Sequence, residues 1–257
     1  MNNERVAAKK KYGQNFLKDE SVLRKIVEAM PKSDNKIVEI GPGLGDLTKF
    51  LVKVKSVEAF EVDTDLCKRL NITFKDEIAT KRLHIHCGDV LEAWQSTLIG
   101  EPYDLVANLP YYIATNIILK ALADPMCKSL LVMVQLEVAQ KFAAESGDKV
   151  FSGLSVITQS VGTASIVIEV PPTAFDPMPK IDSAVMLIQK HSDRADKAFE
   201  NMLRVAFAQP RKTLLKNLSS HYDKKKLSEI FEEMDLSLTI RPHQLHTADY
   251  HQLYKKI

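Results

Sequence analysis

The sequence predicts an α/β fold, in which a doubly wound, mostly parallel sheet is followed by a small C-terminal all-helical domain. From residue 36 to about 140, short apolar strands alternate with helical stretches, which is the rhythm of parallel sheets covered by helices on both faces. Residues 194–257 contain no glycine and repeat apolar residues at helical spacing. We therefore divide the chain into a sheet domain, 1–190, and a helical domain, 191–257.

The elements of the sheet domain are short apolar runs separated by polar residues and glycines. Strands are expected at 36–40, 57–62, 83–85, 103–107 and 129–136. Two β-branched runs at 163–170 and 183–189, on either side of a proline-rich segment, predict a closing pair that includes an antiparallel strand. Helices are expected at 46–54 and 65–74, and a third begins at Ala114 with Thr115 as its N-cap.

Charge is distributed unevenly along the chain. The net formal charge of +2 combines +4 in residues 1–36, −6 in residues 37–189 and +4 in residues 190–257. Basic ends around an acidic middle favour contact of the ends with a polyanion. The alternative is that lysine-rich termini only aid solubility.

No segment of the sequence predicts a membrane or a secreted protein. No apolar run approaches the length needed to span a bilayer. Residues 1–11 are polar and basic and lack the apolar stretch of a signal peptide. We expect a cytoplasmic protein without a membrane partner, and nothing in the sequence requires more than a monomer.

The cysteines and the paired histidines predict no metal site. Cys67, Cys87 and Cys127 are odd in number and far apart, without a CxxC pair, so neither a zinc knuckle nor a disulfide framework is indicated. His84 and His86 alternate in an expected strand, and the sequence around them has no carboxylate–histidine ligand pattern. These histidines are interpreted as strand residues.

A glycine-rich loop at 39–45 follows the first long strand. Gly41 and Gly43 allow a ligand to approach the backbone closely. A GxGxG alone is also compatible with nicotinamide or flavin cofactors. Glu39, however, would repel a pyrophosphate and attract a ligand ammonium group, and Pro42 is unusual in a dinucleotide fingerprint.

Acidic residues follow the next two strands. Glu61 lies 20 residues after Gly41, where an acid can accept hydrogen bonds from a ribose diol. Asp89 can accept from an adenine amine, with Val90 against the ring. Each acid alone is more often a helix cap or a solvated turn. Together they outline an adenosine site, and with Glu39 they fit S-adenosylmethionine better than a dinucleotide.

The tetrapeptide Asn108-Leu109-Pro110-Tyr111 follows the strand at 103–107. An amide oxygen and a backbone carbonyl can accept hydrogen bonds from an NH2 group, and the Tyr111 ring can stack on the base that carries it. The alternative is a strand, a turn and a packed tyrosine.

In these motifs, and in the segments 14–17 and 175–185 (QNFL and FDPMPKIDSAV), the chain resembles the ribosomal RNA adenine N6,N6-dimethyltransferases over nearly its whole length. The resemblance implies a Rossmann-like class I methyltransferase sheet that uses S-adenosylmethionine. It implies that Tyr111 and Phe175 bracket the target adenine, and we expect Asn108 and Leu109 to accept hydrogen bonds from its amine. The cofactor site that the resemblance implies comprises Asn15, Leu17, Gly41, Glu61, Asp89 and Asn108, to which we add Glu39, Gly43, Val62 and Val90 from the same motifs.

The resemblance also implies dimethylation of adjacent adenines in small-subunit (16S) rRNA, on an immature small ribosomal subunit. The region of the family that contacts rRNA is similar to the stretch around Arg204, Arg211, Lys212 and Lys216, where Pro210 predicts a helix start. Lys9, Lys10 and Lys11 are further phosphate contacts to be expected. For each of these side chains the alternative is a solvated face or tail.

Three other interpretations remain open. One is a resistance-type methyltransferase of large-subunit rRNA, although such enzymes tend to be more basic. Another is a non-catalytic ribosome assembly factor with the same fold, against which the intact 108–111 segment argues. A nicotinamide oxidoreductase is disfavoured by Glu39 and Pro42.

Overall fold

The computed structural model describes residues 14–192 and 196–257. The chain forms two compact units, one comprising 1–139 and 165–190 and the other 140–164 and 191–257. Each unit has its own apolar core. No helix in the described part of the chain has the length and apolar character needed to cross a bilayer.

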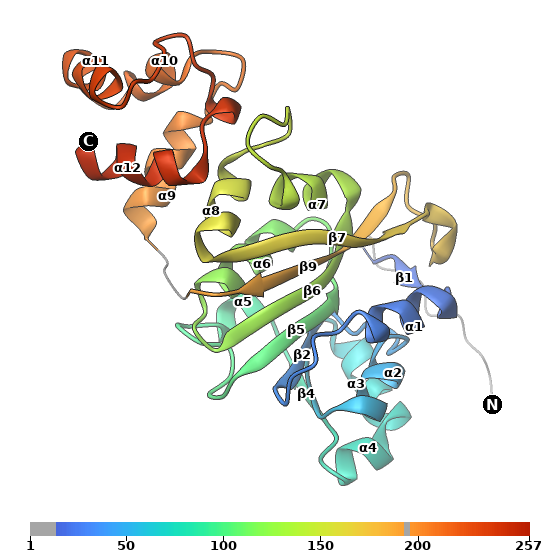
Figure 1. Cartoon of the computed structure of the whole chain (residues 1–257). Coiled ribbons are helices and arrows are strands. Elements are labelled where there is room, and N and C mark those ends of the chain that lie inside the picture. Colours follow the sequence, from blue (N-terminus) through green and yellow to red (C-terminus); the bar gives the residue numbers. More distant parts are fainter. Residues whose placement is uncertain (1–13, 193–195) are drawn as a thin grey trace. The chain divides into compact units, whose positions relative to one another are not determined.

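The first unit is built on a seven-stranded sheet with the order β4-β3-β2-β5-β6-β9-β7 (Figure 1). The strands are β2 (Lys36–Ile40), β3 (Val57–Glu61), β4 (Leu83–Cys87), β5 (Tyr103–Asn108), β6 (Cys127–Gln135), β7 (Gly162–Val170) and β9 (Ser183–Lys190). The pairs β2–β3, β3–β4, β2–β5 and β5–β6 are parallel, and β9 is antiparallel to β6. The predicted parallel sheet with an antiparallel closing strand is therefore confirmed.

Helices connect the parallel strands. They are α1 (Glu20–Glu28), α2 (Thr48–Val54), α3 (Thr64–Thr73), α4 (Lys75–Ala79), α5 (Val90–Ala93) and α6 (Ala114–Ala123), and α7 (Leu136–Ala143) follows β6. One core cluster joins apolar residues of α1, α2 and α3 to strand residues such as Ile37, Ala59 and Val106. Because β2 to β6 pair in parallel, their C-terminal ends share one edge of the sheet.

Two details of the first unit differ from the sequence predictions. The N-cap of α6 is Ile113, and Thr115 lies inside the first turn. The Ile113 amide donates to the Pro110 carbonyl at 3.2 Å, so the proline turn sets the start of the helix. In addition, β1 (Phe16–Leu17) pairs antiparallel with β8 (Phe175–Asp176), just after the 3-10 helix η2 (Pro172–Ala174).

The second unit is helical. Its helices are α8 (Gly153–Val161), α9 (Lys197–Ala206), α10 (Leu214–Leu218), α11 (Lys224–Glu233) and α12 (Thr247–Lys256), with the 3-10 helix η3 (Pro242–Gln244). The helical character predicted after residue 191 is thus present, and residues 140–164, which end in the first residues of β7, group with it. The physical reason is burial, because Phe151 and Val156 pack into the same core as Phe199 and Leu203.

Candidate active site

A pocket lies at the C-terminal ends of β2, β3, β4 and β5. Parallel register brings these ends together, as Ile40 pairs with Phe60 and Glu61 with Cys87. Nearly all of the predicted cofactor and amine residues line this one pocket: Asn15, Leu17, Glu39, Gly41, Gly43, Glu61, Val62, Asp89, Val90, Asn108, Leu109, Pro110 and Tyr111. Open α/β sheets bind their ligands at this edge.

The glycine loop has positive φ angles, a backbone conformation that residues other than glycine rarely adopt. Gly43 has φ +60°, and a Cβ on it would lie 3.2 Å from the Phe16 ring. Its N–H donates to Glu61 Oε2 at 3.1 Å. A side chain at this position would strain the turn and crowd the Phe16 ring. Glycine avoids both, so the loop backbone can lie close to the pocket.

Glu39 is a buried acid in the pocket wall. Its exposed fraction is 2%, and Thr48 Oγ1 donates to its Oε2 at 2.7 Å. Burial raises the pKa of the Glu39 carboxyl to about 8, with a smaller contribution from the Glu61 carboxylate. Such a group is stabilised in its charged form by an approaching cation, which suits a ligand ammonium.

Glu61 is held by the backbone around it. Besides Gly43, the Asp63 N–H donates to its Oε1 at 2.9 Å. Burial raises the pKa of the Glu61 carboxyl, against the effect of these hydrogen bonds. Each carboxylate oxygen has further acceptor capacity, so both can still receive the hydroxyls of a ribose.

Asp89 is both a helix cap and part of the pocket lining. It is the N-cap of α5, and its Oδ1 accepts from the Leu91 N–H at 2.8 Å. It also lines the pocket next to Val90. The cap fixes the carboxylate at the rim, where the second oxygen can accept from an adenine amine.

The N-terminal segment orients the amide of Asn108. Asn108 Nδ2 donates to the Asn15 carbonyl at 3.3 Å. This hydrogen bond fixes the orientation of the amide group. The Asn108 side-chain oxygen, which is a hydrogen-bond acceptor, is not used in it. Asn15 and Leu17 both line the pocket, where the chain enters and forms β1.

Two neighbouring tyrosines lie at the pocket, and the second was not singled out from the sequence. Tyr111 OH and Ser183 Oγ are 2.7 Å apart, and burial raises the pKa of the Tyr111 phenol. Tyr112 lines the same pocket and is 58% exposed. Adjacency to Tyr111 was the only signal for it in the sequence.

Phe175 is not among the residues that line the pocket. It is 5% exposed and belongs to the core cluster of the first unit. Its pairing with Leu17 in the β1–β8 ladder accounts for this burial. The predicted second wall for the base is thus a core residue in this structure.

The predicted RNA-contacting side chains lie in the helical unit, apart from three that are not described. Arg204, Arg211, Lys212 and Lys216 are all exposed. The helix expected from Pro210 begins only at Leu214, because Thr213 caps it by accepting from the Lys216 N–H at 3.2 Å. Lys9, Lys10 and Lys11 fall outside the described residues.

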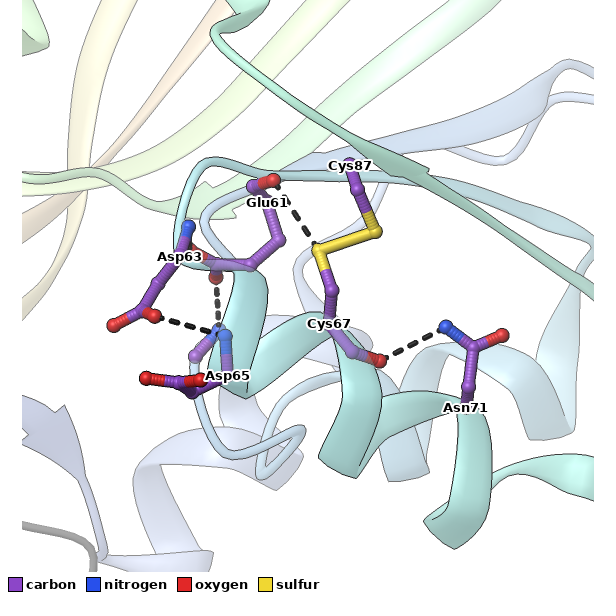
Figure 2. Close-up of a disulfide and its surroundings, with 7 residues drawn as sticks. Glu61, Asp63, Asp65, Cys67, Asn71 and Cys87 are labelled. Carbon is purple, nitrogen blue, oxygen red and sulfur yellow. Dashed lines mark hydrogen bonds between the residues drawn. A yellow bond between two sulfur atoms is a disulfide. The ribbon is translucent and has the colours of Figure 1, made fainter.

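The expectation that no disulfide is present is wrong. Cys67 of α3 and Cys87 of β4 are joined, with their Cα atoms 6.1 Å apart (Figure 2). Strand pairing explains this, because Cys87 lies opposite Glu61, and Cys67 Sγ is 3.4 Å from the Glu61 carbonyl oxygen. The bond therefore ties α3 to the strand that leads to Asp89.

The histidines also have a carboxylate partner that the sequence did not reveal. Glu58 of β3 lies opposite His84 of β4 and contacts both His84 and His86. The carboxylate that the sequence around the histidines lacks comes from the neighbouring strand, β3.

The strand order, the glycine loop and the acids at successive strand ends define a Rossmann-like class I methyltransferase, a class whose methyl donor is S-adenosylmethionine. The family model described as ribosomal RNA adenine dimethylase matches residues 5–257, and this chain belongs to that family. A relative from Sulfurimonas denitrificans is 76% identical over 252 residues, covering 98% of this chain and 94% of the relative. One from Aliarcobacter butzleri is 50% identical, covering 99% and 97%. Both are named ribosomal RNA small subunit methyltransferase A.

Solved structures share the fold. A dimethyladenosine transferase from Plasmodium falciparum has a TM-score of 0.78 at 24% identity, covering 93% of this chain and 95% of that one. The 23S rRNA methyltransferase ErmE has a TM-score of 0.72, also at 24% identity, covering 94% and 99%. At this identity the likeness concerns the fold alone.

Proposed function

We propose that this chain transfers methyl groups from S-adenosylmethionine to the N6 amines of adjacent adenines in small-subunit rRNA, on an immature small subunit in the cytoplasm. One observation carries the proposal: in a chain of the rRNA adenine dimethylase family, the amine-gripping tetrapeptide and the acids at three strand ends line one pocket. Small-subunit specificity rests on the relatives named ribosomal RNA small subunit methyltransferase A. We propose a monomer.

The pocket residues fit S-adenosylmethionine chemically. Glu39 is a buried acid that gains stability from a cation, which suits the ligand ammonium. Glu61 would accept from the ribose hydroxyls and Asp89 from the adenine amine, with Val62 and Val90 against the apolar parts. When bound, the cofactor supplies a methyl group already activated by the sulfonium.

The chain's own contribution to the chemistry is positioning of the target amine. An adenine N6 lone pair is delocalised into the ring and is a poor nucleophile. If Asn108 Oδ1 and the Leu109 carbonyl accept its two N–H groups, the lone pair is directed at the methyl carbon. No strong base is needed, because the amine becomes acidic once methylated. A second transfer requires that one hydrogen bond still holds the methylated nitrogen.

The target base must be unpaired or flipped out to enter this pocket. Tyr111 would stack on one face, a contact worth roughly 1–3 kcal/mol. Phe175 is proposed as the other wall, as the family resemblance implies. Since its ring is buried beside Leu17, that role requires the ring to turn toward the pocket when the base enters.

The helical unit is proposed to bind rRNA through Arg204, Arg211, Lys212 and Lys216, with Lys9, Lys10 and Lys11 as further phosphate contacts. Exposure of the first four supports this role. The sheet unit would then catalyse methyl transfer, and the helical unit would bind the phosphate backbone of the RNA.

The test is transfer of labelled methyl groups to unmethylated small ribosomal subunits, followed by nucleoside analysis for N6,N6-dimethyladenosine. Naked large-subunit RNA is the matched comparison substrate. Incorporation only into large-subunit RNA would make the chain a resistance-type methyltransferase. Binding to small subunits without incorporation into either RNA would make it a non-catalytic assembly factor.

A further inference from the structure

Three potential metal ligands converge on the face of β3 and β4 opposite the one that packs Val57, Ala59 and Leu83 into the core cluster. In the parallel register, Glu58 lies opposite His84 and Phe60 lies opposite His86. Glu58 Oε2 is 3.0 Å from His84 Nδ1 and 2.8 Å from His86 Nε2. One ligand atom from each of the three residues lies within 4.8 Å of the other two. Two imidazole nitrogens thus face a single carboxylate oxygen.

We propose that Glu58, His84 and His86 bind a divalent transition-metal ion of the Zn²⁺ class. Two imidazoles and one carboxylate form a three-ligand set suited to Zn²⁺, with the remaining position left to water. The site is separate from the methyl-transfer pocket, whose lining includes none of the three residues. It replaces the sequence interpretation of the histidines as strand residues only.

The surroundings of the cluster hold the ligands in place and leave a path for the ion. The His84 side chain is 66% exposed and that of Glu58 is 17% exposed, so solvent reaches the cluster. The His86 ring stacks on Phe60 with centroids 4.3 Å apart and planes 9° apart. Such neighbours fix the orientation of metal ligands and tune their affinity.

Lys36 forms an ion pair with the other carboxylate oxygen of Glu58. Its Nζ is 3.3 Å from Glu58 Oε1 and 2.7 Å from Glu101 Oε1. The lysine charge opposes a bound cation, and Glu101 offsets part of that charge. The site should therefore bind more tightly when Lys36 is replaced by an uncharged residue.

An ion at this position would join β3 to β4 near the residues that build the pocket. Glu61 follows Glu58 by three residues, and Asp89 follows His86 by three. β4 is the edge strand of the sheet, so it has a single strand neighbour to hold it. The ion would add a cross-strand link at that edge.

The experiment is a competition titration of ZnCl2 into the metal-free full chain against a chromophoric chelator, without thiol reductant. We expect one ion per chain. His84→Ala should weaken binding by about tenfold or more, and Glu58→Gln should weaken it as well. The matched control is His221→Ala, which removes an exposed histidine of the helical unit and should change nothing. Circular dichroism establishes that each variant is folded.

Two further measurements separate this site from other zinc ligands. The Cys67→Ser, Cys87→Ser double variant should bind one ion as the wild type does, which excludes these two cysteines as ligands. Lys36→Met should bind severalfold more tightly. Absence of 1:1 binding in the wild type, wild-type affinity in folded His84→Ala, or unchanged or weaker binding in Lys36→Met would each overturn the proposal.

Discussion

Glu39 makes cofactor binding dependent on pH in a way that can be measured. Burial raises the pKa of this carboxyl from 4.5 to about 8, so at neutral pH the ligand-free protein holds it mostly protonated. Pairing with a ligand ammonium requires the carboxylate. Binding therefore releases a proton, and affinity should rise with pH below 8.

The magnitude follows from the same pKa. Between pH 6 and pH 7 the ionised fraction of a group with a pKa of about 8 rises about ninefold, and affinity should rise by the same factor. Stability of the ligand-free protein changes in the opposite direction. Because the folded pKa lies above the ordinary value, the Glu39 contribution disfavours the fold increasingly from pH 4.5 to about 8, by about 5 kcal/mol at most.

The assay is calorimetric titration with S-adenosylhomocysteine at pH 6 and pH 7, in buffers of different ionisation enthalpy to count released protons. We expect close to one proton released at pH 7 in the wild type. Glu39→Gln should remove both the proton release and the pH slope. Glu61→Gln, the control, should weaken binding and keep the release. Equal wild-type affinity at the two pH values, without proton release, would refute the role assigned to Glu39.

Four other predictions concern the rest of the molecule. Asn108→Ala should lower kcat for methyl transfer by about 100- to 1,000-fold because a positioned acceptor is lost, while subunit binding measured by sedimentation stays intact. Phe175→Leu removes ring volume from the core and should retain the fold at a cost of about 0.5–3 kcal/mol by urea unfolding, yet lower kcat/KM about 5- to 150-fold through lost stacking on the base. Cys87→Ser should lower stability by about 3 kcal/mol without reductant, and thermal melts of variant and wild type should agree under dithiothreitol. Arg211→Ala with Lys212→Ala should weaken RNA binding and make its log–log salt slope shallower by about 1.4 to 1.8.

Each of these has a contrary outcome. Wild-type turnover in Asn108→Ala would remove the proposed grip on the amine. Wild-type kcat/KM in folded Phe175→Leu would leave that ring as core only, with Tyr112 as the exposed aromatic at the pocket. A wild-type melt that does not respond to reductant would remove the stabilising role of the disulfide. An unchanged salt slope would make the basic stretch a solvated face.

The parts of the fold that sequence reasoning predicted correctly depend on local pattern. The strands of the parallel sheet are short apolar runs, and the turn at Gly43 needs a backbone that glycine adopts readily. The pocket followed from these because parallel strands end at a shared edge. Residues 140–164 group with the helical unit although they precede the boundary expected at 190. Local pattern does not indicate this grouping, since the partners of Phe151 and Val156 in the helical core come more than 40 residues later.

What the sequence could not supply was the pairing of β3 with β4. A single register sets Glu58 against His84 and Glu61 against Cys87, and each pair is separated by 26 residues in the chain. A shift of one residue would have turned both histidines to the opposite face. Neither alternation nor spacing within a strand fixes that choice. The same register thus creates both features that the sequence missed, the carboxylate–histidine cluster on one face and the cysteine that α3 meets on the other.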